Sequence, residues 1–260
     1  MTVFEITKPG TWLNLPNNHQ LSFEVQNLID QLIECFYEAN QALNLFDSEY
    51  SKSYSMQKET WEKDRKEREI VEEQLKKDIG DDNFYIPYEE MRLKVDTIFN
   101  RQKWERGILP NDLKRKNIFI FAKSFLFALD NFQKVFKALL DKNKTSELYS
   151  HLEQSYNEFC DYFKDLREVR NSAHHSEDRI QGLSFGKPIP IKPLSNDFIK
   201  ADSGALLLNV LNNRNYGNTL GNGYYGEVEV SIESLEFARK IVQNILESFQ
   251  WKGPKMYLPR

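Results

Sequence analysis

Three parts of this chain, residues 21–50, 111–180 and 231–250, carry apolar side chains at intervals of three and four residues. That interval matches the turn of an α-helix and gives each helix one apolar face, which has to be buried against another helix. The chain has 260 residues, 18 of them phenylalanine, so it can bury a sizeable core. These features predict a mainly α fold in which the three parts form a helical bundle.

Residues 51–107 are predicted to form a helical insertion in this bundle. Residues 56–79 are mostly charged and have only a thin apolar stripe, which is typical of a solvated helix stabilised by neighbouring opposite charges. Pro87 then opens another helix, because proline favours the first turn. The chain has no internal repeat and no long linker, so we predict a single domain over residues 1–260.

Residues 203–230 are predicted to form a small β-hairpin before the last helix. Residues 205–211 and 224–230 are the expected strands, and the Asn- and Gly-rich segment between them is expected to be a long, mobile loop. Ser231 is expected to cap the last helix. Residues 1–20 are expected to be an irregular lead-in, because they hold two prolines, a glycine and two adjacent asparagines.

Composition limits the environment and the partners of the chain. The net charge of −4 and the pI of about 5.7 provide no overall footprint for nucleic acid. Only two cysteines occur, Cys35 and Cys160, which suits a reducing cytosol and supports neither a disulfide framework nor a Cys-ligated zinc. Neither a signal peptide nor an apolar stretch of about 18 residues is recognisable. We therefore expect a soluble cytoplasmic protein with no membrane partner.

One local basic patch stands out against the acidic background. Basic residues outnumber acidic ones between positions 101 and 116. Such a patch can contact the phosphates of RNA, although most patches of this kind are ordinary solvated surface. The candidate RNA-binding residues are Arg101, Lys103, Arg106, Lys114, Arg115 and Lys116.

The segment Leu166–Ile180, LREVRNSAHHSEDRI, holds two of the four histidines in the chain, His174 and His175. They follow Arg170 and Asn171, which gives the pattern Arg-Asn-x-x-x-His. Histidine ordinarily has a pKa near neutrality, so it can give or take a proton. Arginine stays charged and presents a planar fork that matches phosphate oxygens. The combination suits chemistry at a phosphodiester, although basic residues also favour the carbonyl groups at a helix C-terminus.

The spacing leaves open which histidine works with Arg170. A single helix starting at Thr145 or Ser146 is predicted to run through the motif. On an ideal helix His175 lies about 140° around the axis from Arg170, whereas His174, four residues on, lies on nearly the same side. Either histidine can therefore be the main proton-transfer residue.

A metal site is a competing interpretation of the same segment. The two histidines and the acids Glu177 and Asp178 carry ligand atoms, but adjacent histidines rarely share one ion. The sequence has no distant cluster of His or Cys that would complete a shell, so we expect neither a metal nor a cofactor. Glu177 and Asp178 are instead expected to pair with Arg179 or Arg167 at the helix end.

An Arg-Asn-x-x-x-His segment near the end of a long helix, in a helical bundle with a further helix after it, resembles the HEPN superfamily. The matching residues are Arg170, Asn171 and His175, within RNSAHH, and the likeness covers the predicted bundle. Members of this superfamily include abortive-infection and toxin ribonucleases and the nuclease domains of RNA-guided CRISPR effectors. The resemblance therefore implies an endoribonuclease that acts in bacterial defence or as a toxin.

The resemblance also implies how RNA is cut. The 2′-hydroxyl of the RNA attacks the adjacent phosphorus without a metal and leaves a 2′,3′-cyclic phosphate and a 5′-hydroxyl. In this scheme His175 acts as general base or acid, Arg170 stabilises charge on the phosphoryl oxygens, and Asn171 orients the histidine or holds a phosphate. His174 is the local alternative for a second proton transfer.

In this superfamily two copies of the motif meet across a dimer, which implies a homodimer through the motif helix. A toxin subclass carries a tyrosine two residues after its histidine, where this chain has Glu177, so control by the antitoxin of that subclass is not implied. A different regulatory protein partner stays open. A second class of function also stays open, because many such bundles are non-catalytic modules that bind RNA, nucleotides or proteins.

Overall fold

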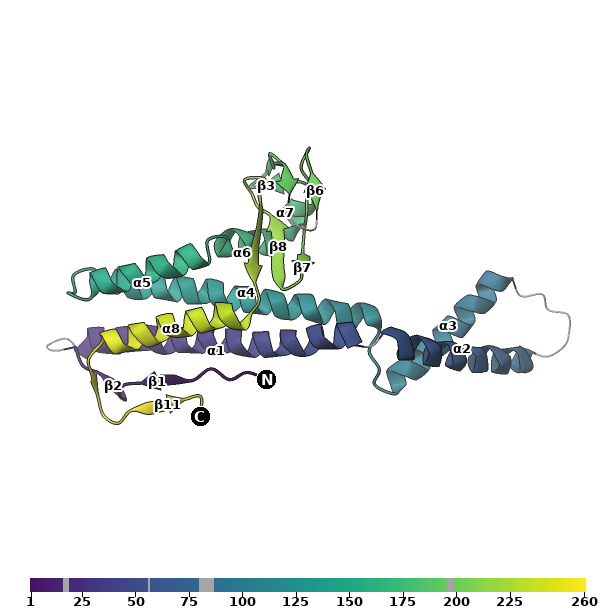
Figure 1. The fold of residues 1–260 in the computed structure, drawn as a ribbon, viewed down its shortest axis with the longest axis horizontal. Helices are drawn as coiled ribbons and strands as arrows, with labels where there is room; N and C mark the ends of the chain where they lie inside the picture. The colour runs from purple at the N-terminus through teal and green to yellow at the C-terminus, as the bar shows by residue number, and fades with distance from the viewer. Residues whose placement is uncertain (16–18, 56, 80–86, 196–198) are drawn as a thin grey trace. The chain divides into compact units, whose positions relative to one another are not determined.

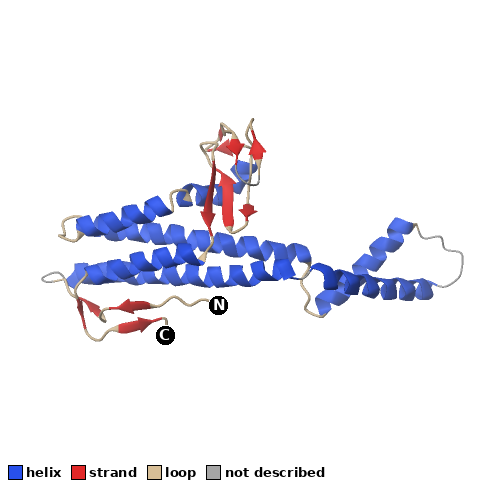
Figure 2. Cartoon of the chain, in the orientation of Figure 1, coloured by secondary structure: helices blue, strands red, loops and turns tan. Residues whose placement is uncertain are grey.

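The computed structural model describes residues 1–15, 19–55, 57–79, 87–195 and 199–260. This described part is mainly helical with small β-hairpins (Figure 2), which confirms the predicted mainly α class. The chain forms two compact units, residues 1–46 with 119–260 and residues 47–118. The first unit contains the Arg-Asn-x-x-x-His motif, and the second contains the basic patch.

Aromatic rings join the helices of the first unit. Phe132 stacks on Phe159 with the ring centroids 4.9 Å apart, and Tyr162 stacks on Phe237 at 4.1 Å. The helices therefore pack through the apolar faces that the spacing predicts. The long helices of this unit (Figure 1) are α1 (His19–Ser55), α4 (Asn111–Lys142), α5 (Tyr149–Tyr162) and α8 (Ile232–Ser248). One end of α1 and one end of α4 belong to the second unit.

The prediction of one continuous motif helix is wrong. Helix α5 starts at Tyr149 and not at Thr145 or Ser146, because the Ser146 hydroxyl accepts a hydrogen bond of 3.2 Å from the Leu148 N–H and holds the chain in a turn. After α5 the motif segment is divided between two shorter helices, α6 (Leu166–His174) and α7 (Ser176–Ile180).

The break between α5 and α6 centres on Phe163. Its backbone has left helical values, with φ −103° and ψ 45°. The ring of Phe163 is buried, with its centroid 4.8 Å from that of Phe159 and 6.2 Å from that of Phe237 on α8. The apolar area buried by this ring between α5 and α8 contributes to the stability of the bend and offsets part of the cost of the backbone bonds that are lost.

The sheet at the predicted hairpin has three strands, one more than predicted. The predicted loop supplies the central strand, and residues 205–209 do not form the strand expected there. Asn213 has a left-handed backbone with φ 52°, which asparagine tolerates, so a tight turn can form inside the predicted loop. The strands pair in the antiparallel order β7 (Val210–Asn212), β8 (Asn215–Thr219) and β9 (Tyr225–Glu229).

The prediction of an irregular lead-in is also wrong. β1 (Ile6–Lys8) pairs antiparallel with β11 (Met256–Leu258), and β2 (Trp12–Leu13) pairs with β10 (Trp251–Lys252). These pairings join residues more than two hundred positions apart, and no local sequence pattern predicts them. The side-chain amides of Asn40 and Asn44 on α1 each donate a hydrogen bond of 2.9 Å to the Thr2 carbonyl and hold the lead-in on the bundle.

Two further short hairpins are formed by β3 (Leu183–Ser184) with β4 (Lys187–Pro188), and by β5 (Leu194–Ser195) with β6 (Lys200–Ala201).

The second unit is built on the antiparallel pair α2 (Gln57–Ile79) and α3 (Tyr88–Glu105). Helix α3 begins directly after Pro87, as predicted. Val71, Val95 and Phe99 form the small core between the two helices. Ion pairs border this core, and Arg68 also lies over the Phe99 ring at 4.7 Å. Asp64, Glu67 and Arg68 of α2 therefore hold α2 on α3 and on Arg106 directly after it, while other charged residues of α2 pair with one another at i,i+4, as predicted.

Ser231 caps α8, as predicted: its hydroxyl oxygen accepts a hydrogen bond of 3.1 Å from the Ser234 N–H. Ser231 is only 1% exposed, so water cannot replace the lost bond. We expect Ser231→Ala to lower the free energy of unfolding, measured by urea denaturation, by about 1–2 kcal/mol. Ser248→Ala, which removes an exposed hydroxyl at the other end of α8, should change it by less than about 0.5 kcal/mol. Equal losses in the two variants would contradict the capping role.

Candidate functional site

The motif arginine is held by a buried carboxylate on α4. Arg170 Nε lies 3.1 Å from Asp130 Oδ2, and the side chains are 20% and 2% exposed, respectively. Lys134 Nζ lies 2.5 Å from the same oxygen. The Nε–H of Arg170 is buried and makes no hydrogen bond within the described part of the chain, so the attraction to Asp130 is one of charge more than of aligned geometry. Two cations therefore share one carboxylate, which leaves this group with a net positive charge.

The ring of Phe127 on α4 contacts two motif side chains, those of Arg170 and His174. The Arg170 guanidinium carbon lies 5.2 Å from the centroid of the Phe127 ring, and the His174 ring meets the same ring edge-on at 6.1 Å. Arg170 Nη1 donates a hydrogen bond of 3.3 Å to Asn171 Oδ1. Cation–π and aromatic contacts of this kind hold the arginine and the histidine on one ring.

The two histidines lie at a second break in the chain. α6 ends at His174, and His175 has a non-helical backbone with φ −98° and ψ 48°. The 140° separation expected on an ideal helix therefore does not apply. The two imidazole rings are 5.0 Å apart at 79° to one another, and both residues are exposed. The structure thus brings Arg170, Asn171, His174 and His175 into one connected group.

The expected pairing of Glu177 with Arg179 or Arg167 is wrong. Glu177 Oε1 instead lies 3.6 Å from His175 Nδ1. A backbone N–H bond at Glu177 and the neighbouring His175 lower the pKa of this carboxyl. Arg179 is only 3% exposed, because the short α7 directs it inward, where its Nε donates to Ser172 Oγ at 3.2 Å.

Asp130 and Phe127 are site residues that the motif alone does not reveal. Both lie on α4, some forty positions before the motif. Asp130 does leave a signal in the sequence, since it is an acid within the apolar stripe of Leu126 and Leu129, and a carboxylate on a buried face needs a positive partner. The identity of that partner depends on the packing of α6 against α4. Phe127 leaves no signal beyond its aromatic character.

The predicted RNA-binding residues belong to the second unit, and two of them are already paired. Lys103 Nζ lies 2.7 Å from Asp64 Oδ2, and Arg106 Nη2 lies 2.7 Å from Glu67 Oε2. The acids on α2 therefore neutralise part of the patch, which the local count of charges between positions 101 and 116 does not include. The remaining predicted residues are Arg101, Lys114, Arg115 and Lys116, of which Lys114 is half-buried and the others are exposed.

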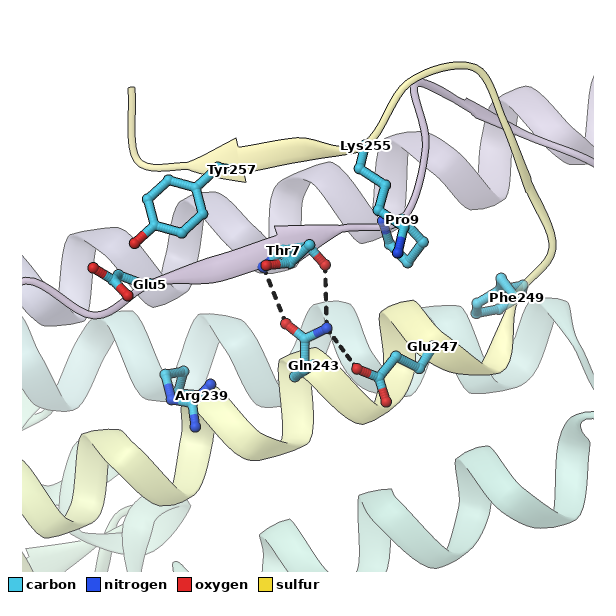
Figure 3. Close-up of a pocket in the computed structure, with 9 residues that line it drawn as sticks. All are labelled: Glu5, Thr7, Pro9, Arg239, Gln243, Glu247, Phe249, Lys255 and Tyr257. Atoms are coloured by element: carbon cyan, nitrogen blue, oxygen red, sulfur yellow. Dashed lines mark hydrogen bonds between the residues drawn. The ribbon is translucent and has the colours of Figure 1, made fainter.

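A cavity of about 630 Å³ lies apart from the motif, against β1, β11 and α8 (Figure 3). Gln243 crosses it: its Nε2 donates to the Thr7 carbonyl at 3.1 Å and to Glu247 Oε1 at 2.8 Å, and its Oε1 accepts from the Thr7 N–H at 3.1 Å. These bonds fix β1 on α8, so the polar groups of the cavity serve the fold. The cavity is lined by Glu5, Thr7, Pro9, Arg239, Gln243, Glu247, Phe249, Lys255 and Tyr257.

Among the described residues, no group of three or more His, Cys, Asp or Glu side chains is arranged to hold a metal ion. Within the same ranges, no helix combines the length and the apolarity that crossing a bilayer requires. The chain matches no protein-family profile, no curated protein and no solved structure among those compared. The candidate site is therefore defined by the contacts of this chain alone.

The pairing at Asp130 makes a prediction about stability. Asp130→Ala leaves the half-buried Arg170 without its carboxylate, so we expect the free energy of unfolding to fall by about 2 kcal/mol. Asp141→Ala is the matched control, because Asp141 lies on the same helix and pairs with Lys144 while 42% exposed. That control should lose much less, because an exposed ion pair contributes little to stability. Urea unfolding measures both, and a loss at Asp130 no larger than that at Asp141 would show that the buried pairing is unimportant.

Proposed function

We propose that this chain is a metal-independent endoribonuclease of the HEPN type, acting in bacterial defence or as a toxin. Its site is formed by Arg170, Asn171, His174 and His175. The observation that carries the proposal is the connected group on Phe127: the Arg170 guanidinium and the His174 ring both contact the Phe127 ring, and the His175 ring lies 5.0 Å from that of His174. A cation held in place and a proton-transfer group beside it are what phosphodiester cleavage by an internal nucleophile requires.

The proposed reaction uses the RNA's own 2′-hydroxyl as nucleophile. His175 takes the proton of the 2′-hydroxyl as the O2′–P bond forms, and the P–O5′ bond breaks. A second imidazole gives a proton to the departing 5′-oxygen. The products are a 2′,3′-cyclic phosphate and a 5′-hydroxyl, so neither a metal-activated water nor a redox step is needed.

Arg170 stabilises the charge that grows on the non-bridging phosphoryl oxygens. The sharing of Asp130 between Arg170 and Lys134 supports this role, because two cations against one carboxylate leave a net positive charge. Pre-organisation supports it as well, since an arginine that is already fixed on Phe127 and bonded to Asn171 need not be ordered when RNA binds.

A homodimer is part of the proposal. One copy supplies a single motif arginine and one adjacent histidine pair, and a two-fold axis would double both and provide a proton donor opposite the base. The contact is proposed to include Ile180, which ends α7 close to the motif in sequence and is 71% exposed. His174 supplies the second proton transfer if the site acts within one copy.

The central test is cleavage of an end-labelled RNA in EDTA, with detection of the 2′,3′-cyclic phosphate. We expect the natural chain to cleave, His175→Ala to lose at least about 100-fold in rate, and His174→Ala to lose less. Arg170→Lys should lose much of the rate although it keeps the charge, because it loses the planar fork. His151→Ala and Arg167→Lys are the matched controls, since both residues are exposed and lie outside the site, and both should keep full activity.

Each other result points to a different class of function. Retention of RNA without cleavage would favour a non-catalytic binding module. Cleavage that appears only after a divalent metal is added would favour a metal site. Equal loss in the His174 and His175 variants would mean that the two roles are not divided as proposed.

The dimer has its own test, which is the mass in solution measured by light scattering. We expect twice the chain mass of 30.8 kDa, and we expect Ile180→Asp to reduce both the mass and the rate of cleavage, because a charge cannot be buried in an apolar contact. Ile70→Asp is the control, a 66% exposed isoleucine on α2 that should tolerate the change. A strictly monomeric chain that cleaves RNA at nanomolar concentration would contradict the dimeric site and assign the second proton transfer to His174.

A further inference from the structure

The hairpin directly after the motif carries an unusually exposed aromatic residue. β3 and β4 are joined by a two-residue turn, Phe185 and Gly186, with φ values of 51° and 73°. Such turns favour Asn, Asp or Gly, and a bulky side chain in the left-handed region is strained. Phe185 is nevertheless 89% exposed, so its ring gains almost nothing from burial in return for this strain. The fold itself gives no reason for a phenylalanine at this position.

The hairpin is fixed to the motif helix by the buried Arg179. Its Nε donates to Ser172 Oγ at 3.2 Å, and its Nη1 donates to the Leu183 carbonyl at 2.7 Å. Ser172 lies between the motif residues Asn171 and Ala173 on α6, and Leu183 opens β3, which lies beside α7 (Figure 1). One side chain therefore bonds both the motif helix and the hairpin, and the position of the turn is set relative to the site.

The loop before β9 packs against the hairpin. A Cβ atom at Gly221 would lie only 2.6 Å from Ser184 Oγ and 3.5 Å from Arg179 Nη2, so this loop packs closely against both the hairpin and the arginine. The Ile189 N–H also donates to the Gly182 carbonyl at 2.8 Å and closes the base of the hairpin. The turn therefore presents the exposed Phe185 ring from a hairpin that is held in place by Arg179 and by the loop before β9.

We propose that Phe185 stacks on an unpaired base of the RNA whose phosphate binds at Arg170. This inference rests on the proposed ribonuclease function and extends it to the choice of substrate. Base stacking is the contact that an exposed, fixed aromatic ring makes with single-stranded nucleic acid. The charges agree with this occupant, because the exposed Lys187 follows the ring on the same hairpin and the Arg170–Lys134–Asp130 group is net positive. A base inside a duplex has both faces covered, so Phe185 selects RNA that is unpaired at this nucleotide.

The test is the affinity for a fluorescently labelled single-stranded oligoribonucleotide, measured by anisotropy with His175→Ala in every protein so that no cutting occurs. Adding Phe185→Asn should weaken binding about tenfold or more, because one stacking contact is lost. Adding Phe185→Trp should keep or strengthen binding. Asparagine suits the left-handed turn better than phenylalanine, so weaker binding by that variant cannot come from misfolding, and its thermal midpoint should be no lower than that of the parent.

A duplex of the same sequence is the control ligand, and its affinity should not change with residue 185. Unchanged single-strand affinity in the asparagine variant would overturn the stacking role, while cleavage by the natural chain would still support the ribonuclease. Equal weakening for single strand and duplex would also overturn it, because the ring would then not read the unpaired state. If the parent binds RNA through Phe185 but the natural chain never cleaves, the stacking role stands and the ribonuclease function fails.

Discussion

Asp130 is an acid buried on α4, and its need for a positive partner ties the motif helix α6 to α4 through Arg170. A carboxylate that is 2% exposed is stable as an ion only beside positive charge, and Arg170 and Lys134 supply that charge. Lys134 is on the same helix, whereas Arg170 comes from α6. The pairing therefore fixes α6 on α4 and, through Phe127, brings His174 to the same place.

The two chain breaks around α6 follow from burial and make the site accessible. Phe163 leaves the helix because its ring is buried between α5 and α8, so α6 is free to take its own direction. His175 ends α6, and Arg179 turns inward to Ser172 and β3. The result is a short helix whose inner side is held by buried polar bonds, while its end presents two imidazoles to solvent.

The two units use their charges in different ways. In the second unit, Lys103 and Arg106 are paired with acids of α2, so part of the basic patch is already neutralised. In the first unit, the Asp130 carboxylate faces two cations, so the charge around Arg170 is net positive, while the Glu177 carboxylate lies beside His175. This difference supports the choice of the motif, more than the patch, as the phosphate site in the proposed function.

The helical class, the buried faces, the start of α3 after Pro87 and the Ser231 cap could be predicted from the sequence, because they depend on periodicity and on bonds within a few residues. The sequence also singled out Arg170, Asn171, His174 and His175 as neighbours along the chain. The division of the motif helix, the central strand β8 and the pairing of β1 with β11 could not be predicted in this way, since each depends on packing against distant parts of the chain. The same holds for Asp130 and Phe127: local pattern can show that a buried acid needs a cation, but only packing decides which cation it meets.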